Sequence, residues 1–130
     1  MKTIRVAAAV IMRRGEVLIC DRPPEKPPAG WEFPGGKLEP GETPVECLKR
    51  ELREELALEV TVFDQLYQVE HRQADRVIRL HFIRCLLPET ATPRPQERQH
   101  CRWVRLAELP EAGLLEPDRP VAEFLAAERV

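Results

Sequence analysis

The feature that most constrains this chain is residues 36–58, where strong signals for a helix coincide with a cluster of glutamates. Thr43 is a suitable N-cap, Pro44 occupies the first helical position, and Glu46 completes a capping box. We therefore predict a helix from about Pro44 to Leu56. Its expected buried stripe consists of aliphatic residues at 3-4-4 spacing, namely Val45, Leu48, Leu52 and Leu56.

An acidic flank runs beside this stripe. Glu51, Glu54 and Glu55 should lie on the side of the helix that leads to solvent. Because like charges at i, i+3 and i+4 repel by roughly a few tenths of a kcal/mol per pair, we expect this flank to hold a cation. Carboxylate oxygens favour a hard divalent metal and, behind it, a phosphate. The alternative is a solvated acidic helix with an i,i+4 ion pair from Arg50 to Glu54.

The spacing of the segment, G-x5-E-x7-R-E-U-x-E-E-x-G-U with U an aliphatic residue, resembles the Nudix box. The matching residues are Gly36, Glu42, Arg50, Glu51, Leu52, Glu54, Glu55 and Leu58. One position differs from the motif: Ala57 occupies the place of the second glycine of the family. If that residue needs a positive φ, alanine costs about 1 kcal/mol, which concerns helix termination and not the chemistry. From Ile4 to about Phe124 the chain is similar to MutT-like nucleoside triphosphate pyrophosphohydrolases.

This resemblance implies a site for magnesium, with manganese as an alternative. The implied ligands are the Gly36 carbonyl, Glu51, Glu54, Glu55 and, from outside the box, Glu97. The implied catalytic residues are Glu51, Glu54 and Arg50, with Glu51 as the candidate general base for an attacking water. We interpret Arg50 as an organiser that pairs with neighbouring carboxylates, and Glu42 as the residue that orients the preceding loop.

Three residues are candidates for contact with the substrate. The resemblance implies that Arg22 contacts phosphate, whereas the alternative is a solvent-exposed arginine at a strand end. Lys37 directly follows Gly36 and could face the same phosphate. Phe33 could stack on a base, although core packing is the favoured interpretation for this side chain.

Asp118 is the candidate for base selection. MutT proper carries asparagine in the similar stretch, and relatives that act on CTP and modified dCTP carry aspartate. An ionised aspartate only accepts hydrogen bonds, which suits the exocyclic amine of cytosine or the N1–H and N2 edge of guanine. The alternative is that Asp118, two residues before Pro120, is a helix N-cap.

Length and composition fit a single domain over residues 1–130, with 43% hydrophobic and 32% charged residues. The net charge of −2 lacks the basic excess that proteins binding nucleic-acid polymers usually have. No segment approaches the roughly 18 apolar residues of a membrane span, and no signal peptide is recognisable. The four cysteines form no C-x-x-C motif, so we expect reduced, mostly buried thiols of a cytoplasmic protein and not zinc ligands.

The remaining pattern predicts an α+β fold. Expected strands are Ile4–Met12, Val17–Cys20, Trp31–Phe33, Leu58–Val69, Val77–Leu87 and Cys101–Leu106. Two of them, Leu58–Val69 and Val77–Leu87, should pair antiparallel, and a C-terminal helix should run from Asp118 to near Arg129. The resemblance implies an α/β/α sandwich with a mixed sheet and the glutamate-bearing helix packed on one side.

We therefore expect a magnesium-dependent hydrolase that converts a (deoxy)nucleoside triphosphate to the monophosphate and pyrophosphate. The expected role is sanitation of the nucleotide pool, of the 8-oxo-dGTP type or of the CTP and modified dCTP type. Alternatives are an RNA 5′-pyrophosphohydrolase, disfavoured by the acidic net charge, and a non-catalytic nucleotide-sensing module, disfavoured by the intact glutamates. The expected partner is the small-molecule substrate, with no membrane partner, and the chain is expected to be a monomer or homodimer.

Overall fold

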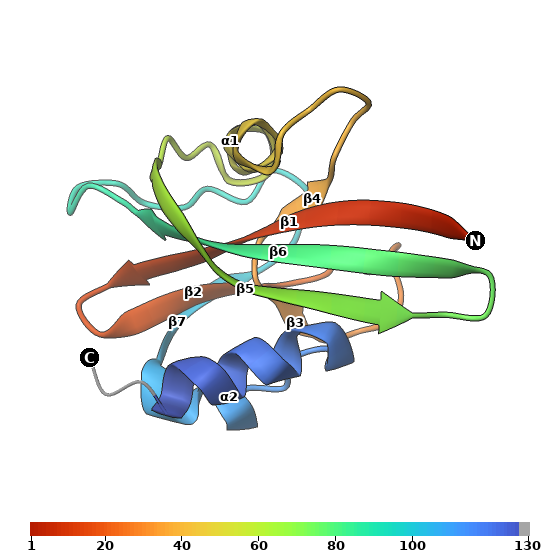
Figure 1. The fold of residues 1–130 in the computed structure, drawn as a ribbon. Coiled ribbons are helices and arrows are strands. Elements are labelled where there is room, and N and C mark those ends of the chain that lie inside the picture. The colour runs from red at the N-terminus through yellow and green to blue at the C-terminus, as the bar shows by residue number, and fades with distance from the viewer. Residues whose placement is uncertain (128–130) are drawn as a thin grey trace.

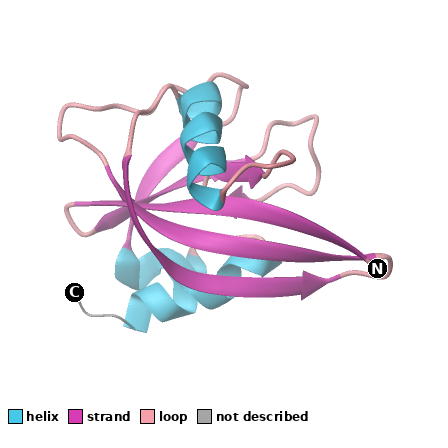
Figure 2. Ribbon diagram, turned by 45° about the horizontal axis from the view of Figure 1, so that its top comes forward, coloured by secondary structure: helices cyan, strands magenta, loops and turns pink. Residues whose placement is uncertain are grey.

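A mixed β-sheet with a helix on each face forms the body of the molecule, and the computed structural model describes residues 1–127 (Figures 1 and 2). The strands are β1 (Lys2–Arg13), β2 (Glu16–Asp21), β3 (Trp31–Glu32), β4 (Gly35–Lys37), β5 (Thr61–Arg72), β6 (Arg76–Leu86) and β7 (Cys101–Arg105). The helices are α1 (Pro44–Leu56) and α2 (Arg119–Ala127), and two short 3-10 helices span Leu106–Glu111 and Glu116–Asp118. The predicted α+β sandwich is therefore confirmed.

The sheet is mixed because one central pair of strands is parallel. Its order is β3-β2-β1-β6-β5, with β4 also paired to β1 and β7 also paired to β2. β1 and β6 are parallel, whereas the other pairs are antiparallel, including the predicted β5–β6 hairpin. β1 is covered on both faces, which explains why residues 7–11 form a continuous buried run without polar alternation.

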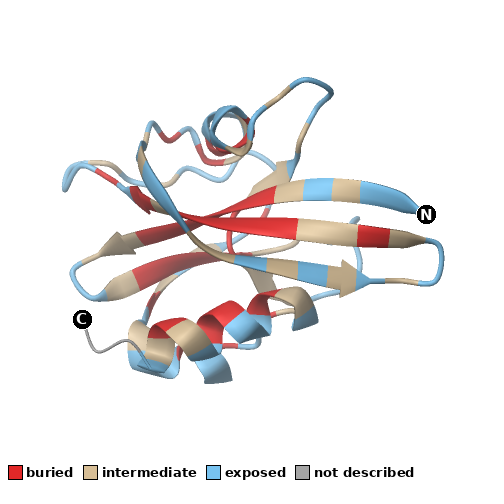
Figure 3. Ribbon diagram, viewed as in Figure 1, coloured by how far each residue is buried: buried red, intermediate tan, exposed pale blue. Residues whose placement is uncertain are grey.

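Two hydrophobic cores lie on the two faces of the sheet, and buried segments occupy the middle of the strands in Figure 3. The core on the α1 side includes Ile11, Leu18, Leu48, Leu52, Leu56 and Ile83. The core on the α2 side includes Val10, Ile19, Phe33, Phe82, Val121 and Leu125. Because α1 packs on β1 and β4, its remaining surface is free to carry the acidic flank.

The start and end of α1 agree with the prediction, but one residue of its buried stripe does not. Thr43 and Glu46 form the predicted capping box, and the helix spans Pro44–Leu56. Val45 was expected to be buried and is 39% exposed. Side chains tilt toward the helix N-terminus, so a residue in the first turn points beyond the packed part of the helix. Cys47 is buried instead, beside the Gly36 carbonyl.

Other element boundaries differ modestly from those predicted. β5 begins at Thr61 because Leu58 still belongs to the helix end, where its N–H donates to the Leu52 carbonyl. β4, which was not predicted as a strand, pairs Gly35 and Gly36 with β1. The expected helix end at Arg129 lies outside the described residues. Across residues 1–127 the helices are too short or too polar to span a membrane.

The end of α1 generates a stability prediction. Ala57 adopts φ 54° and ψ 40°, the left-handed region expected for the position at which the family has glycine. Because the alanine Cβ is unfavourable there, Ala57→Gly should raise the free energy of unfolding by about 1 kcal/mol. Urea denaturation measures this change. Ala126→Gly is the matched control in the right-handed helix α2 and should lower stability. Destabilisation by Ala57→Gly would contradict the strain assigned to Ala57.

Candidate functional site

The acidic flank of α1 faces a loop that arrives from the far end of the chain. The N–H of Gln96 donates to the Glu55 carbonyl at 2.9 Å, and the N–H of Arg94 donates to the Leu56 carbonyl at 2.8 Å. These bonds satisfy carbonyls at the helix end and bring the following residue, Glu97, next to the helix. Glu97 lies far from the box in sequence, and the fold brings it to the same site.

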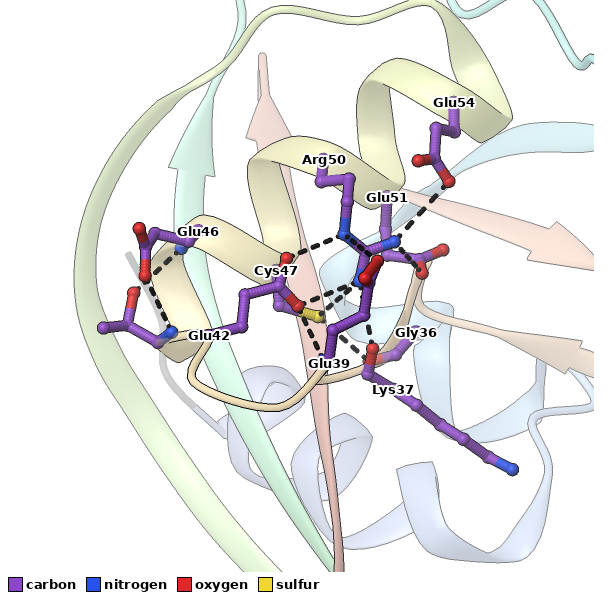
Figure 4. Close-up of polar contacts among 10 residues, drawn as sticks. Gly36, Lys37, Glu39, Glu42, Glu46, Cys47, Arg50, Glu51 and Glu54 are labelled. Atoms are coloured by element: carbon purple, nitrogen blue, oxygen red, sulfur yellow. Dashed lines mark hydrogen bonds and ion pairs between the residues drawn. The ribbon is translucent and has the colours of Figure 1, made fainter.

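Arg50 lies at the centre of the glutamates (Figure 4). Its Nε and Nη2 donate to the two Glu42 carboxylate oxygens at 2.7 and 2.9 Å, and its Nη1 donates to Glu51 at 2.9 Å. It also lies 3.0 Å from Glu39 and 3.5 Å from Glu54. The bidentate pair with Glu42 fixes the guanidinium plane. The predicted contacts of Arg50 with neighbouring carboxylates are confirmed, and the i,i+4 pair with Glu54 that the alternative of a solvated helix predicted is also present.

Glu42 connects the loop before α1 to this guanidinium. Its carboxylate accepts from Arg50 and also from the Glu39 backbone N–H at 2.8 Å. The hydrogen bonds from the Arg50 side chain and then from the Glu39 N–H lower the pKa of Glu42 to about 2. Glu42 is therefore ionised throughout the neutral range, and it holds the loop as predicted.

Gly36 packs closely against the Glu51 side chain of α1. A Cβ at this position would collide with the carboxylate of Glu51, so a side chain here would displace the carboxylate. The Gly36 carbonyl accepts from the Cys47 thiol at 3.4 Å, and the role of this carbonyl as a metal ligand stays a prediction. Lys37 is exposed, and its side chain extends away from the Arg50 cluster in Figure 4.

Glu55 is the glutamate whose environment differs most from the prediction. It was expected to lie toward solvent, but it is only partly exposed because the loop containing Gln96 covers the helix end. Burial, a hydrogen bond with Glu51 and the charges of Glu51, Glu97 and Glu32 together raise the pKa of Glu55 to about 9. Full ionisation of these neighbouring carboxylates is therefore unfavourable unless a cation offsets their charge.

The chemistry of this group fits a hard divalent cation, which would offset the mutual repulsion of the carboxylates. As the side chains stand, no three His, Cys, Asp or Glu residues within 1–127 are arranged to hold a metal ion. Glu97 instead forms an ion pair with Lys26 at 3.4 Å, and Arg50 engages Glu51. Metal binding therefore requires these side chains to reorient. Such rotamer changes are inexpensive relative to uncompensated carboxylate repulsion, so the gathered negative charge favours them when a cation binds.

Glu32 is a functional candidate that sequence reasoning missed. It lies on β3, its pKa is raised by burial, and Arg22 is 3.8 Å away. Its charge contributes to the raised pKa of both Glu55 and Asp118. The available signal was an acidic residue enclosed by two aromatic residues in the run W-E-F.

Asp118 lies in the core on the α2 side of the sheet and is 5% exposed. Its carboxylate accepts from the backbone N–H of Phe33 at 2.9 Å, so the bond reaches across the fold and not into the first turn of α2. Burial raises the pKa of Asp118 to about 7, and the Phe33 hydrogen bond opposes this shift. The Phe33 ring is 3% exposed and contacts Phe82 edge to face, which confirms core packing for that side chain.

Comparison with known proteins supports a common origin for this arrangement. The model of the NUDIX domain family matches residues 1–125. The chain is 38% identical to a CTP pyrophosphohydrolase of Escherichia coli K12, covering 99% of this chain and 96% of the relative. It is 41% identical to an 8-oxo-dGTP diphosphatase of Proteus vulgaris, covering 78% of this chain and 90% of the relative. The solution structure of the E. coli ORF135 protein superposes with a TM-score of 0.85 at 38% identity, covering 99% of this chain and 94% of that one.

The pair of Arg50 and Glu42 generates a prediction about pH. Because the pKa of folded Glu42 is about 2 and its ordinary value is 4.5, the pair stabilises the fold fully above about pH 4.5. This stability is lost as the pH falls toward about 2. Glu42→Gln should therefore melt at a lower temperature than the wild type at neutral pH, and the difference should shrink over that acidic window. Thermal denaturation as a function of pH measures it.

The control for this experiment is Glu123→Gln, which replaces an exposed glutamate of α2. It should melt like the wild type at every pH. A difference between the wild type and Glu42→Gln that stays constant from pH 7 to pH 2.5 would show that the effect is not carried by ionisation of Glu42.

Proposed function

The chain belongs to the Nudix hydrolase family, and on that premise we propose that it hydrolyses a (deoxy)nucleoside triphosphate to the monophosphate and pyrophosphate. The observation that carries this proposal is the group of carboxylates on α1, held by Arg50 and extended by Glu97 and Glu32 toward Asp118. The activities for which the two relatives are named, on CTP and on 8-oxo-dGTP, both fall in this reaction class. The proposed role is sanitation of the nucleotide pool.

We propose that magnesium, or manganese in its place, is held by the Gly36 carbonyl and by Glu51, Glu54, Glu55 and Glu97. When bound, such an ion neutralises the charge that develops on the phosphoryl oxygens during hydrolysis. The raised pKa of Glu55 supports this assignment, because a cation would restore the ionised form of a carboxyl that burial and neighbouring carboxylates disfavour.

Other residues of the chain orient the general base, remove a proton from the attacking water and bind the phosphates. Arg50 keeps the Glu51 carboxylate in place through the bond at 2.9 Å, and Glu51 takes the proton of the attacking water. Arg22 and Lys37 supply positive charge to the phosphates. Arg22 lies beside Glu32, so binding of a phosphate would exchange one anionic partner for another.

For the base, we propose that Asp118 supplies the selecting group. Its carboxylate is buried and already bound to the Phe33 N–H through one oxygen, which leaves the other oxygen for a base edge. The pKa of this carboxyl is about 7. In its ionised form it can only accept hydrogen bonds, and in its protonated form it can also donate one. The four free thiols are consistent with a reducing compartment, and we propose that the reaction takes place in the cytoplasm. We also propose that the active species is a monomer or homodimer.

The proposed metal site predicts that Glu54→Gln or Glu55→Gln removes most turnover while the fold survives. Loss of a carboxylate that neutralises the site should lower kcat by about 100-fold or more. Release of pyrophosphate in the presence of magnesium measures turnover, and a melting curve reports the fold. Glu59→Gln is the matched control, since Glu59 lies just past the helix and pairs with Arg53. Full activity in both site variants would refute the assignment.

Asp118→Asn tests the choice of base. A panel of canonical, oxidised and methylated (d)NTPs, scored for pyrophosphate release, should give a different order of preference for the variant, because asparagine both donates and accepts at every pH. Since the pKa of Asp118 is about 7, the wild type should also show an ionisation near neutrality in kcat/KM that the variant lacks. Triphosphorylated RNA is included as a substrate of the alternative class.

The raised pKa of Asp118 also predicts a pH dependence of stability, whether or not Asp118 selects the base. Because the folded pKa is raised, ionisation of Asp118 destabilises the wild type as the pH rises from about 4 to about 7, and Asp118→Asn should not show this loss. An unchanged order of preference together with this difference in stability would mean that Asp118 only supports the fold.

A further inference from the structure

Two cysteines from distant parts of the chain face each other near the acidic site. Cys20, near the end of β2, is paired directly with Cys101, at the start of β7, and their sulfur atoms are 3.0 Å apart. Both side chains belong to the core on the α1 side of the sheet. The negative charges of Glu55 and Glu32 act on Cys20, which places the thiol pair beside the carboxylates.

The register of the two strands makes this pair suitable for a covalent bond. The next pair along, Asp21 and His100, is hydrogen-bonded, since the Asp21 N–H donates to the His100 carbonyl at 2.9 Å. Hydrogen-bonded and non-hydrogen-bonded pairs alternate in antiparallel strands, so Cys20 and Cys101 form a non-hydrogen-bonded pair. Such pairs hold their Cα atoms about 4.5 Å apart, which lies at the short end of the range that a disulfide spans.

The two thiols also differ in access and in acidity. Cys20 is 4% exposed, whereas Cys101 is partly exposed. The hydrogen bond between the two thiols lowers the pKa of Cys101 and raises that of Cys20, so Cys101 has the greater thiolate character. The other two cysteines, Cys47 and Cys85, are buried, and burial raises their pKa to about 11 and about 12.

We propose that Cys20 and Cys101 are a redox modification site, at which hydrogen peroxide forms a reversible disulfide. The Cys101 thiol loses its proton to solvent, its thiolate attacks a peroxide oxygen, and the O–O bond breaks to give a sulfenic acid. The hydroxide that leaves takes up one proton from solvent and becomes water. The Cys20 sulfur then attacks this sulfenic sulfur, the S–O bond breaks, and water leaves with the Cys20 proton. Together the two sulfurs lose two electrons and the peroxide gains them, giving one disulfide and two waters.

The position of this disulfide ties it to the proposed active site. Cys20 precedes Arg22 by two residues, and Cys101 follows Glu97 by four. The bond would therefore join the bases of the two loops that carry these residues. The formation of the disulfide does not depend on the proposed hydrolytic function, and it is measured without any substrate.

The test uses the full chain, reduced, freed of reductant and treated while folded with hydrogen peroxide at a small molar excess. Alkylation after unfolding, followed by peptide mass mapping, should find Cys47 and Cys85 alkylated and a peptide that links Cys20 to Cys101. Dithiothreitol should restore all four thiols to alkylation. The same treatment in concentrated urea should give no preference for this pair.

Variants separate the two steps. Cys20→Ser should stop at the sulfenic acid, which dimedone traps at Cys101, and Cys85→Ser should form the disulfide as the wild type does. Four alkylatable thiols after treatment, a disulfide between other cysteines or between molecules, or oxidation of Cys101 without a disulfide would each overturn the proposal. The map of the wild type is decisive even if Cys20→Ser does not fold.

Discussion

The bidentate ion pair between Arg50 and Glu42 is the interaction on which the candidate site depends. It joins the middle of α1 to the loop that leaves β4, and the same guanidinium reaches Glu51. The positive charge of the planar Arg50 guanidinium reduces the repulsion between the carboxylates that lie around it. Gly36 completes the arrangement, because only a residue without a side chain leaves room for the Glu51 carboxylate. The loop, the strand and the helix are thus positioned by one set of contacts.

Two carboxyl groups of the site, those of Glu55 and Asp118, destabilise the folded state when they ionise. Burial and neighbouring negative charge raise the pKa of Glu55, and burial raises the pKa of Asp118. Such groups favour the folded state less as they ionise, and groups with pKa values perturbed in this way cluster at functional sites. The charge of Glu32 contributes to both shifts.

Much of the fold and part of the site could be predicted before the structure was known. The capping box, the helix bounds, the β5–β6 hairpin and the positive φ at Ala57 follow from signals within a few residues of one another. The contacts of Arg50 follow from spacing along one helix. The predictions of a buried Val45 and of a solvent-facing Glu55 differ from the structure, because burial depends on where the helix packs and on which loop covers its end.

The sequence by itself therefore determined the helix, its carboxylates and the family, because these depend on short-range geometry and on fixed spacing. Only the tertiary structure decided which groups meet across long separations. The approach of Glu97 to Glu55, the bond from Phe33 to Asp118 and the contact of Cys20 with Cys101 all require strands and loops far apart in the chain. Desolvation and neighbouring charges at these tertiary contacts shift the pKa values of the groups involved. Such shifts cannot be predicted from a local sequence pattern.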